Sequence, residues 1–102
     1  MRRPTFFILS ALAEQPRHGY GIIQRATQLS DGEVELGPGT LYGALERLQE
    51  NGLIVLDREE VESGRQRRYY RLAESGREAL AGELARLQRD VVVGRSALGG
   101  AL

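Results

Sequence analysis

The chain has 102 residues, 41% hydrophobic and 27% charged, which is the size and composition of one soluble globular domain. It has no cysteine and only one histidine, which excludes disulfides and thiolate metal sites, and no apolar run reaches the ~20 residues that span a bilayer. The formal net charge is zero, so the molecule as a whole is not a general polyanion binder. We expect a cytoplasmic protein with no cofactor and no membrane partner.

Two short amphipathic helices are predicted before residue 30. The first covers residues 4–13 and begins with proline at a favoured first helical position. Its inward candidates recur at helical spacing: Ile8, Leu9 and Leu12. The second begins at residues 18–20, and its inward stripe is Ile22, Ala26 and Leu29. We interpret His18 and Tyr20 as structural residues that pack this second helix against its neighbours.

A third helix is predicted after a loop over residues 30–37, beginning at Pro38 and stopped by Gly52. One face of this helix is apolar and contains Leu41, Ala44, Leu45 and Leu48. The opposite face carries Gly39, Gly43 and Arg47. Each glycine weakens a helix by about 1 kcal/mol. The glycines are either merely tolerated or present because the backbone must closely approach another surface, such as a DNA groove.

The hydrophobic period changes after Gly52 and predicts an antiparallel hairpin. Residues 53–56 form a short apolar strand, and residues 67–72 alternate, with Tyr70 and Leu72 on the core side. Residues 57–66 between them are polar and contain the turn pair Ser63-Gly64, so we expect a long hairpin tip. Residues 64–71 hold four arginines and no acidic residue, and the rigid donor forks of arginine suit phosphates and guanine edges: Arg65, Arg67, Arg68 and Arg71.

A fourth helix is predicted from about Ser75, which has capping-box spacing to Glu78. Its apolar residues are Leu80, Leu84, Leu87 and Val91. This stripe is too long for so small a domain to cover, which favours a dimer seam over a role in the intramolecular core. We expect the tail over residues 96–102 to be frayed.

Three helices, a hairpin and a long helix are the element order of a winged helix-turn-helix protein. The fold class is therefore mainly α with a small β-hairpin. Residues 1–74 form the predicted DNA-binding domain, and residues 75–102 form a C-terminal dimerisation helix with its tail. In this architecture the third helix can enter the major groove while the hairpin reaches neighbouring phosphates or the minor groove.

The chain resembles the PadR-type transcriptional regulators, in the short form with one C-terminal helix. The resemblance covers about residues 7–87. Three segments carry it: His18-Gly19-Tyr20-Gly21-Ile22, the stretch from Gly39-Thr40-Leu41-Tyr42 to Gly52-Leu53-Ile54, and Arg68-Tyr69-Tyr70-Arg71-Leu72 with Gly76-Arg77. It implies a homodimer whose C-terminal helices pack against the partner, and a repressor that a small molecule often releases from its operator.

Carried over residue by residue, the resemblance implies that Thr40 and Tyr42 face DNA and that Arg68 with its neighbours belongs to the wing. Two departures from the family pattern matter. Ala73 stands where the family usually has threonine, so the usual cap of the last helix is missing and Ser75 is the substitute candidate. Glu33 and Glu35 place negative charge just before the third helix, which makes that loop a poor phosphate clamp.

Together these observations select eight residues for DNA contact: Gly39, Thr40, Tyr42, Gly43, Arg47, Arg65, Arg67 and Arg68. Several have an ordinary structural alternative. Thr40 could cap its helix, Tyr42 could pack against the core, and Arg47 could pair with the glutamates beside it. The wing arginines could likewise be neutralised by the acidic residues of positions 57–62 across the hairpin.

The leading functional hypothesis is a homodimeric, sequence-specific repressor of a two-fold symmetric operator in double-stranded DNA. A hydrophobic small-molecule effector would bind in an apolar chamber at the dimer seam, lined by Phe6, Phe7, Leu84 and Leu87. The alternative is a winged-helix module that binds other proteins and not DNA, which the zero net charge favours. We do not expect an enzyme, because the sequence shows no nucleophile–base pair, carboxylate dyad or phosphate-binding loop.

Overall fold

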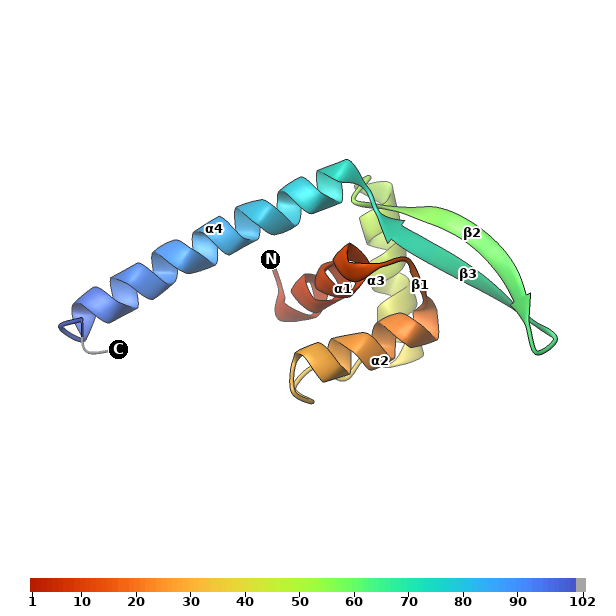
Figure 1. Cartoon of the computed structure of the whole chain (residues 1–102), viewed down its shortest axis with the longest axis horizontal. Coiled ribbons are helices and arrows are strands. Elements are labelled where there is room, and N and C mark those ends of the chain that lie inside the picture. Colours follow the sequence, from red (N-terminus) through yellow and green to blue (C-terminus); the bar gives the residue numbers. More distant parts are fainter. Residues whose placement is uncertain (101–102) are drawn as a thin grey trace.

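The computed structural model describes residues 1–100, which form four helices and a three-stranded antiparallel sheet. The elements are α1 (Arg3–Glu14), β1 (Arg17–His18), α2 (Gly19–Leu29), α3 (Pro38–Glu50), β2 (Ile54–Glu62), β3 (Arg65–Leu72) and α4 (Glu74–Ala97). Figure 1 shows α1, α2 and α3 gathered in the centre, with the β2–β3 hairpin and α4 projecting to opposite sides. The molecule is elongated, 58 × 27 × 21 Å, and its elements follow the predicted order.

The core lies where the three helices and the base of the hairpin meet. The predicted inward residues of the first and third helices are all buried there, as are Ile22, Ala26, Ile54, Tyr70 and Leu72. Leu29 is only half-buried. The loop before α3 also contributes two side chains, Val34 and Leu36, that the prediction missed.

The loop before α3 is held in place by the end of α2. The hydroxyl of Thr27 donates to the carbonyl oxygen of Val34 at 3.0 Å, and the Ser30 hydroxyl accepts from the Val34 N–H at 2.9 Å. Val34 is buried, and buried backbone groups need such partners. This loop therefore fixes the position of α3, although its sequence shows no helical or strand period.

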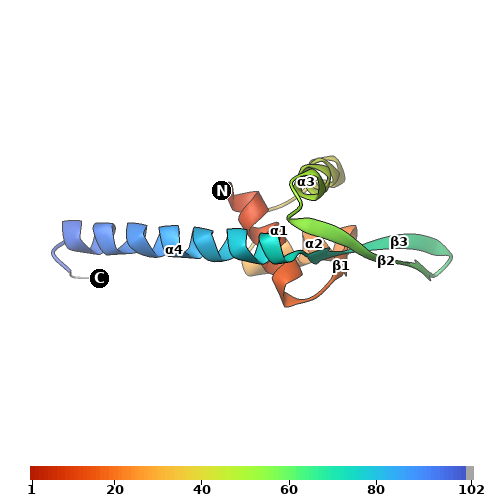
Figure 2. The same cartoon turned by 90° about the horizontal axis from the view of Figure 1, so that it is seen from above.

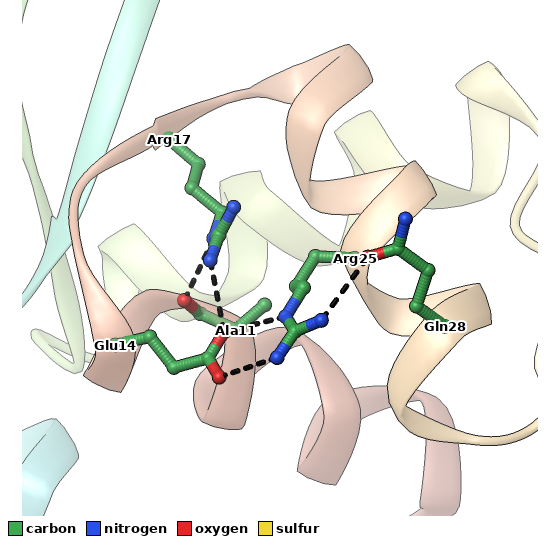
Figure 3. Close-up of polar contacts among 5 residues, drawn as sticks. All are labelled: Ala11, Glu14, Arg17, Arg25 and Gln28. Carbon is green, nitrogen blue, oxygen red and sulfur yellow. Dashed lines mark hydrogen bonds and ion pairs between the residues drawn. The ribbon is translucent and has the colours of Figure 1, made fainter.

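The junction between α1 and α2 is closed by a polar cluster, drawn in Figure 3. Arg17 donates to the Ala11 carbonyl oxygen at 3.0 Å and to the Glu14 carboxylate at 2.8 Å. Arg25 of α2 donates hydrogen bonds to both oxygens of the same carboxylate, at 2.7 and 2.8 Å, and to the side-chain oxygen of Gln28 at 3.1 Å. The cluster thereby fixes the turn that carries β1 and the start of α2.

The sheet has the strand order β1-β3-β2. β1 pairs with β3 through Arg17 opposite Tyr70 and His18 opposite Tyr69. This two-residue strand was not predicted, because two residues are too few to show an alternating pattern. It joins the start of α2 directly to the hairpin.

The prediction of a long hairpin tip over residues 57–66 is wrong. β2 and β3 stay paired out to Glu62 opposite Arg65, and Ser63 and Gly64 alone make the turn, both with positive φ. The polar residues misled the prediction because a hairpin that projects into solvent can be polar on both faces while its backbone still pairs. A register shift between Leu56 and Arg58 interrupts the ladder. Such an irregularity bends and twists a hairpin, and the hairpin in Figure 1 is visibly curved.

α4 begins at Glu74, close to the predicted start at about Ser75, but the expected capping box does not form. Its N-cap is Ala73, without a side-chain cap, and Ser75 lies inside the helix, where its hydroxyl donates to the Gly52 carbonyl oxygen at 2.5 Å. Ser75 is therefore an anchor to the end of α3 and not a substitute cap. Figure 2 shows α4 and the hairpin extending in opposite directions, with α3 to one side of that line.

The tail that was predicted to fray, residues 96–102, begins inside α4. α4 runs to Ala97, and its end is closed by bonds from the Gly99 N–H to the Ser96 carbonyl oxygen and from the Gly100 N–H to that of Arg95. Positive φ at both glycines permits this closure. Residues 101–102 of the predicted tail lie outside the described part of the chain. Nowhere in residues 1–100 is a helix both long and apolar enough to cross a bilayer.

Candidate nucleic-acid interface

The first turn of α3 is open to solvent. Its N-cap is Gly37, no side chain caps it, and Pro38 stands at the start. Gly39 and Thr40 are exposed, so the structure contradicts the alternative that Thr40 caps the helix. An uncapped helix N-terminus presents free N–H groups and the positive end of the helix dipole. This turn can therefore receive an anion.

A hollow of about 340 Å³ opens between the starts of α2 and α3 and the strand β3. It is lined by His18, Gly19, Tyr20, Tyr42, Arg65, Gln66, Arg67, Arg68 and Tyr70. Three of the predicted contact residues on β3 thus meet Tyr42 of α3. The lining is predominantly polar, with arginine as its only charged residue type.

The interpretation of Tyr20 as a packing residue is wrong. Its side chain is 58% exposed and lines the hollow, comparable to the 56% exposure of Tyr42. A helical wheel could have shown this, because Tyr20 lies about 200° around the helix from the buried Ile22. The structure supports the packing alternative for Tyr42 in part, and its contact with DNA stays a prediction. Its ring packs over Gly19, where an added Cβ would come within 2.8 Å of the hydroxyl oxygen, while much of the side chain stays open.

The wing arginines differ in how they are paired. Arg68 is 3.2 Å from the Glu59 carboxylate across the hairpin, and Arg67 is 3.6 Å from Glu62. Arg65 has no ion pair within residues 1–100. The predicted neutralisation by the acidic strand is therefore present for two of the three. Because exposed ion pairs contribute only about 0–1 kcal/mol, the exposed Arg68 can exchange its carboxylate for a phosphate at little cost.

His18 holds the start of α2. Its Nδ1 atom accepts a hydrogen bond from the Gly21 N–H at 3.1 Å, which makes it the N-cap, so its interpretation as a structural residue holds. The Arg67 guanidinium lies against the ring, with Nη1 3.2 Å from Nδ1. Tyr69 meets the ring edge-to-face at 5.2 Å. Burial lowers the pKa of His18, and the nearby charge of Arg67 lowers it further.

A second polar group stands beside this imidazole. The Tyr69 hydroxyl donates to the Glu62 carboxylate, which raises the pKa of the tyrosine and lowers that of the acid. The Arg58 guanidinium lies over the Tyr69 ring, 4.0 Å from its centre. These contacts form a connected network along the wing, from Tyr69 opposite His18 to Glu62 beside the turn.

Arg47 lies apart from the wing arginines. It lines a separate hollow of about 290 Å³ together with Arg2, Thr5 and residues of α3 and the following loop. Within residues 1–100 it forms no ion pair with Glu46 or Glu50, so the structure gives no support to that alternative. The negative charge before α3 is also partly engaged, because Glu33 pairs with Arg3 of α1 at 2.8 Å.

The predicted dimerisation stripe on α4 is divided. Leu80 is partly buried against the core, whereas Leu84, Leu87 and Val91 are exposed along the projecting part of the helix. The three exposed side chains thus form an apolar strip that the rest of residues 1–100 covers only in part.

The predicted effector residues are partly brought together. A hollow of about 350 Å³ between α1 and α4 is lined by Phe6, Phe7 and Leu87, but not by Leu84. Its polar rim was not predicted. There Glu83 is buried, accepts two bonds from Arg86 at 2.6 and 2.9 Å, and lies 3.5 Å from the terminal amine of Met1. Within residues 1–100, no group of three or more His, Cys, Asp or Glu is placed to hold a metal ion.

Comparison with known proteins gives a consistent assignment. Residues 8–82 match the profile of the transcriptional regulator PadR-like family. Transcriptional regulator Rv3488 of Mycobacterium tuberculosis is 39% identical over 92 residues, which cover 87% of this chain and 82% of that protein. An uncharacterized 37.1 kDa protein in transposon TN4556 of Streptomyces fradiae is 44% identical over 82 residues, 80% of this chain, but this chain spans only 22% of that protein's length.

A solved structure confirms the winged-helix fold. Bacillus subtilis PadR, whose crystal structure is in complex with operator DNA, superposes with a TM-score of 0.71 over 81% of this chain and 48% of that chain. The two sequences are 23% identical over this match. The predicted fold class is therefore correct.

Proposed function

The chain belongs to the PadR-like family of transcriptional regulators, and from this premise we propose that it is a homodimeric repressor that binds operator DNA sequence-specifically. The observation that carries the proposal is the hollow beside α3. There Tyr20 and Tyr42 meet the arginines of β3, next to an uncapped helix N-terminus. Hydroxyls, guanidinium groups and free helix N–H groups are the donors that proteins use for DNA phosphates.

In this proposal α3 enters the major groove by its N-terminal half. Gly39 and Gly43 present no side chains there, so the backbone can approach the bases closely, with Thr40 between them. Arg65 and Arg68 contact the flanking phosphates from the wing, and Arg47 reaches the backbone farther along α3. Residues 1–74 act as the DNA-binding domain.

The same proposal assigns residues 75–102 to dimerisation. The exposed strip of Leu84, Leu87 and Val91 supports this assignment, because apolar side chains aligned on a projecting helix are stabilised when a second copy covers them. A two-fold dimer would bind half-sites separated by about one helical turn, ~34–36 Å. The hollow between α1 and α4, with Phe6 and Phe7, is where a hydrophobic effector would bind and alter the angle between the two DNA-binding domains.

The test is DNA binding by the purified protein to the region upstream of its own gene, titrated with salt and with unrelated duplex as competitor. If the dimer neutralises ~6 phosphates, the affinity should fall about a thousandfold between about 50 and 200 mM salt. Replacing Arg65, Arg67 and Arg68 together by alanine should weaken binding while the protein stays folded. Salt-insensitive binding, or unchanged affinity in the triple variant, would contradict the wing mechanism. No duplex binding at all would favour the protein-interaction module.

A further inference from the structure

Arg67 differs from the other two wing arginines in where its guanidinium group lies. Its side chain is 27% exposed, against 68% for Arg68, and its Nε atom is buried without a hydrogen-bond partner. Its Nη1 atom lies 3.2 Å from Nδ1 and 3.5 Å from Nε2 of His18, a residue 49 positions away in the chain. Much of this guanidinium therefore faces the protein and not the solvent.

We propose that Arg67 is a positioning residue, which holds the wing against the N-terminus of α2 through His18 and leaves the phosphate contacts to Arg65 and Arg68. We call this contact between Arg67 and His18 the latch. This inference rests on the proposed function, because it divides roles among residues of that DNA-binding surface. The inference adds that the contact between Arg67 and His18 sets the geometry of the DNA-binding surface.

The imidazole of His18 is shared between two elements. Its Nδ1 atom accepts from the Gly21 N–H in the first turn of α2 and also meets the guanidinium of β3. Tyr20 lies in that same first turn and lines the same hollow as Arg65 and Arg68. Because one side chain caps the helix and contacts the strand, it sets the separation between Tyr20 and the wing.

The latch requires a neutral imidazole. A protonated ring would carry a proton on Nδ1, could not accept from Gly21, and would repel the guanidinium. The groups that face the ring are Arg67 and Tyr69 from β3 and Glu62 from β2, with the Tyr42 hydroxyl in the same hollow. Arg17, the neighbour in β1, is turned away to Glu14. The contact should therefore weaken as the pH falls below about 6.5.

The first experiment uses the free protein and needs no DNA. His18 is the only histidine, so its ring proton resonances can be followed by NMR during a pH titration without assignment of the rest. We expect the wild-type ring to titrate below 6.5, and to titrate at higher pH in Arg67→Gln, because the repelling charge is gone. Arg68→Gln is the matched control and should leave the titration unchanged. Equal titration curves for wild type and Arg67→Gln would overturn the latch.

The second experiment separates positioning from phosphate contact. Loss of a phosphate contact lowers the slope of log affinity against log salt by about 0.9, and Arg68→Gln should show this loss. Arg67→Gln should weaken binding by about tenfold, because the wing loses its fixed position, with the slope unchanged. A lowered slope in Arg67→Gln would identify it as a phosphate contact and overturn the inference.

A histidine variant tests the same contact from its other side. His18→Asn keeps an acceptor for the N-cap but does not titrate. Its DNA affinity should lose the decline below about pH 6.5 that we expect in the wild type. The double variant His18→Asn with Arg67→Gln should bind no more weakly than Arg67→Gln alone; additive losses would contradict the latch. If wild-type protein binds no duplex, the proposed function fails, while the NMR titration still decides the latch.

Discussion

Glu14 is a single residue that joins three elements. It ends α1 and accepts hydrogen bonds from Arg17 of β1 and from Arg25 of α2 (Figure 3). The hydrogen bonds from Arg25, followed by the charges of Arg25 and Arg17, lower the pKa of this carboxyl group to about 2. Folding therefore favours its ionised form, and the stability that this gives is lost at acidic pH, where the unfolded chain binds a proton and the folded protein does not.

We expect Glu14→Gln to reduce the free energy of unfolding at neutral pH, because a neutral amide cannot hold two guanidinium groups. The carboxylate's contribution is fully present above the ordinary pKa of 4.5 and is lost as the pH falls toward about 2. The difference between wild type and variant should therefore shrink over that range. Urea unfolding at several pH values and one protein concentration measures it.

Glu46 supplies the control for this prediction. It is exposed on α3 and forms no ion pair within residues 1–100, so Glu46→Gln should change stability little at any of these pH values. A Glu14→Gln deficit that stays constant down to pH values near 2 would show that shape, and not charge, holds the junction together.

At the scale of the element, two of the glycines in α4 have opposite surroundings. Gly82 has open space where a Cβ would stand. At Gly76 an added Cβ would overlap the carbonyl oxygen of Leu53 and press on the Leu72 side chain. That same carbonyl oxygen accepts from the Ala73 N–H at 2.9 Å, so it cannot move away freely. Gly76 is thus the point where α4 crosses closely over the start of β2.

Substitution by alanine should therefore have opposite effects at the two positions. Gly82→Ala should stabilise the protein by about 0.5–1 kcal/mol, the ordinary gain of alanine over glycine in a helix. Gly76→Ala should destabilise it by about 2 kcal/mol or more, because the clash outweighs that gain. Thermal or urea unfolding of both variants checks this. A stabilising Gly76→Ala would show that α4 does not pack on Leu53 as described.

At the scale of the whole molecule, the notable feature is a helix that leaves the body of the protein. Figure 2 shows α4 extending away from the three-helix core. Two valines of this projecting part, Val91 and Val93, are both exposed and lie about 200° apart on the helix. Val91 belongs to the strip formed with Leu84 and Leu87, whereas Val93 lies on the opposite face. They form a matched pair for testing the proposed dimer seam.

Val91→Glu should weaken dimerisation by about a hundredfold or more, because it buries an unpaired charge in each copy of the seam. Val93→Glu should leave the dimer intact. Sedimentation velocity over a range of concentrations measures both. The monomeric variant should also bind the upstream duplex more weakly, since each half-site is then bound separately. Monomeric wild-type protein, or equal effects of the two substitutions, would contradict a seam along this strip.

The sequence by itself determined the order of the elements, the helix stripes, the stops at Gly52 and Ser63-Gly64, and the face of β3 that carries Tyr70 and Leu72. Hydrophobic periodicity and turn residues indicate local backbone geometry and burial, and these two signals can be seen directly in the sequence. The motifs shared with the PadR-like family also placed the candidate DNA-contacting residues in α3 and the wing.

Only the tertiary structure decided how these pieces meet. It revealed the short strand β1, the burial of Val34 and Leu36, and the exposure of Tyr20, and it replaced the expected cap at Ser75 by an anchor to Gly52. Above all it set Arg67 against His18, across 49 residues of chain. No local pattern encodes such a contact, because it depends on where two separately formed elements come to lie when the core packs.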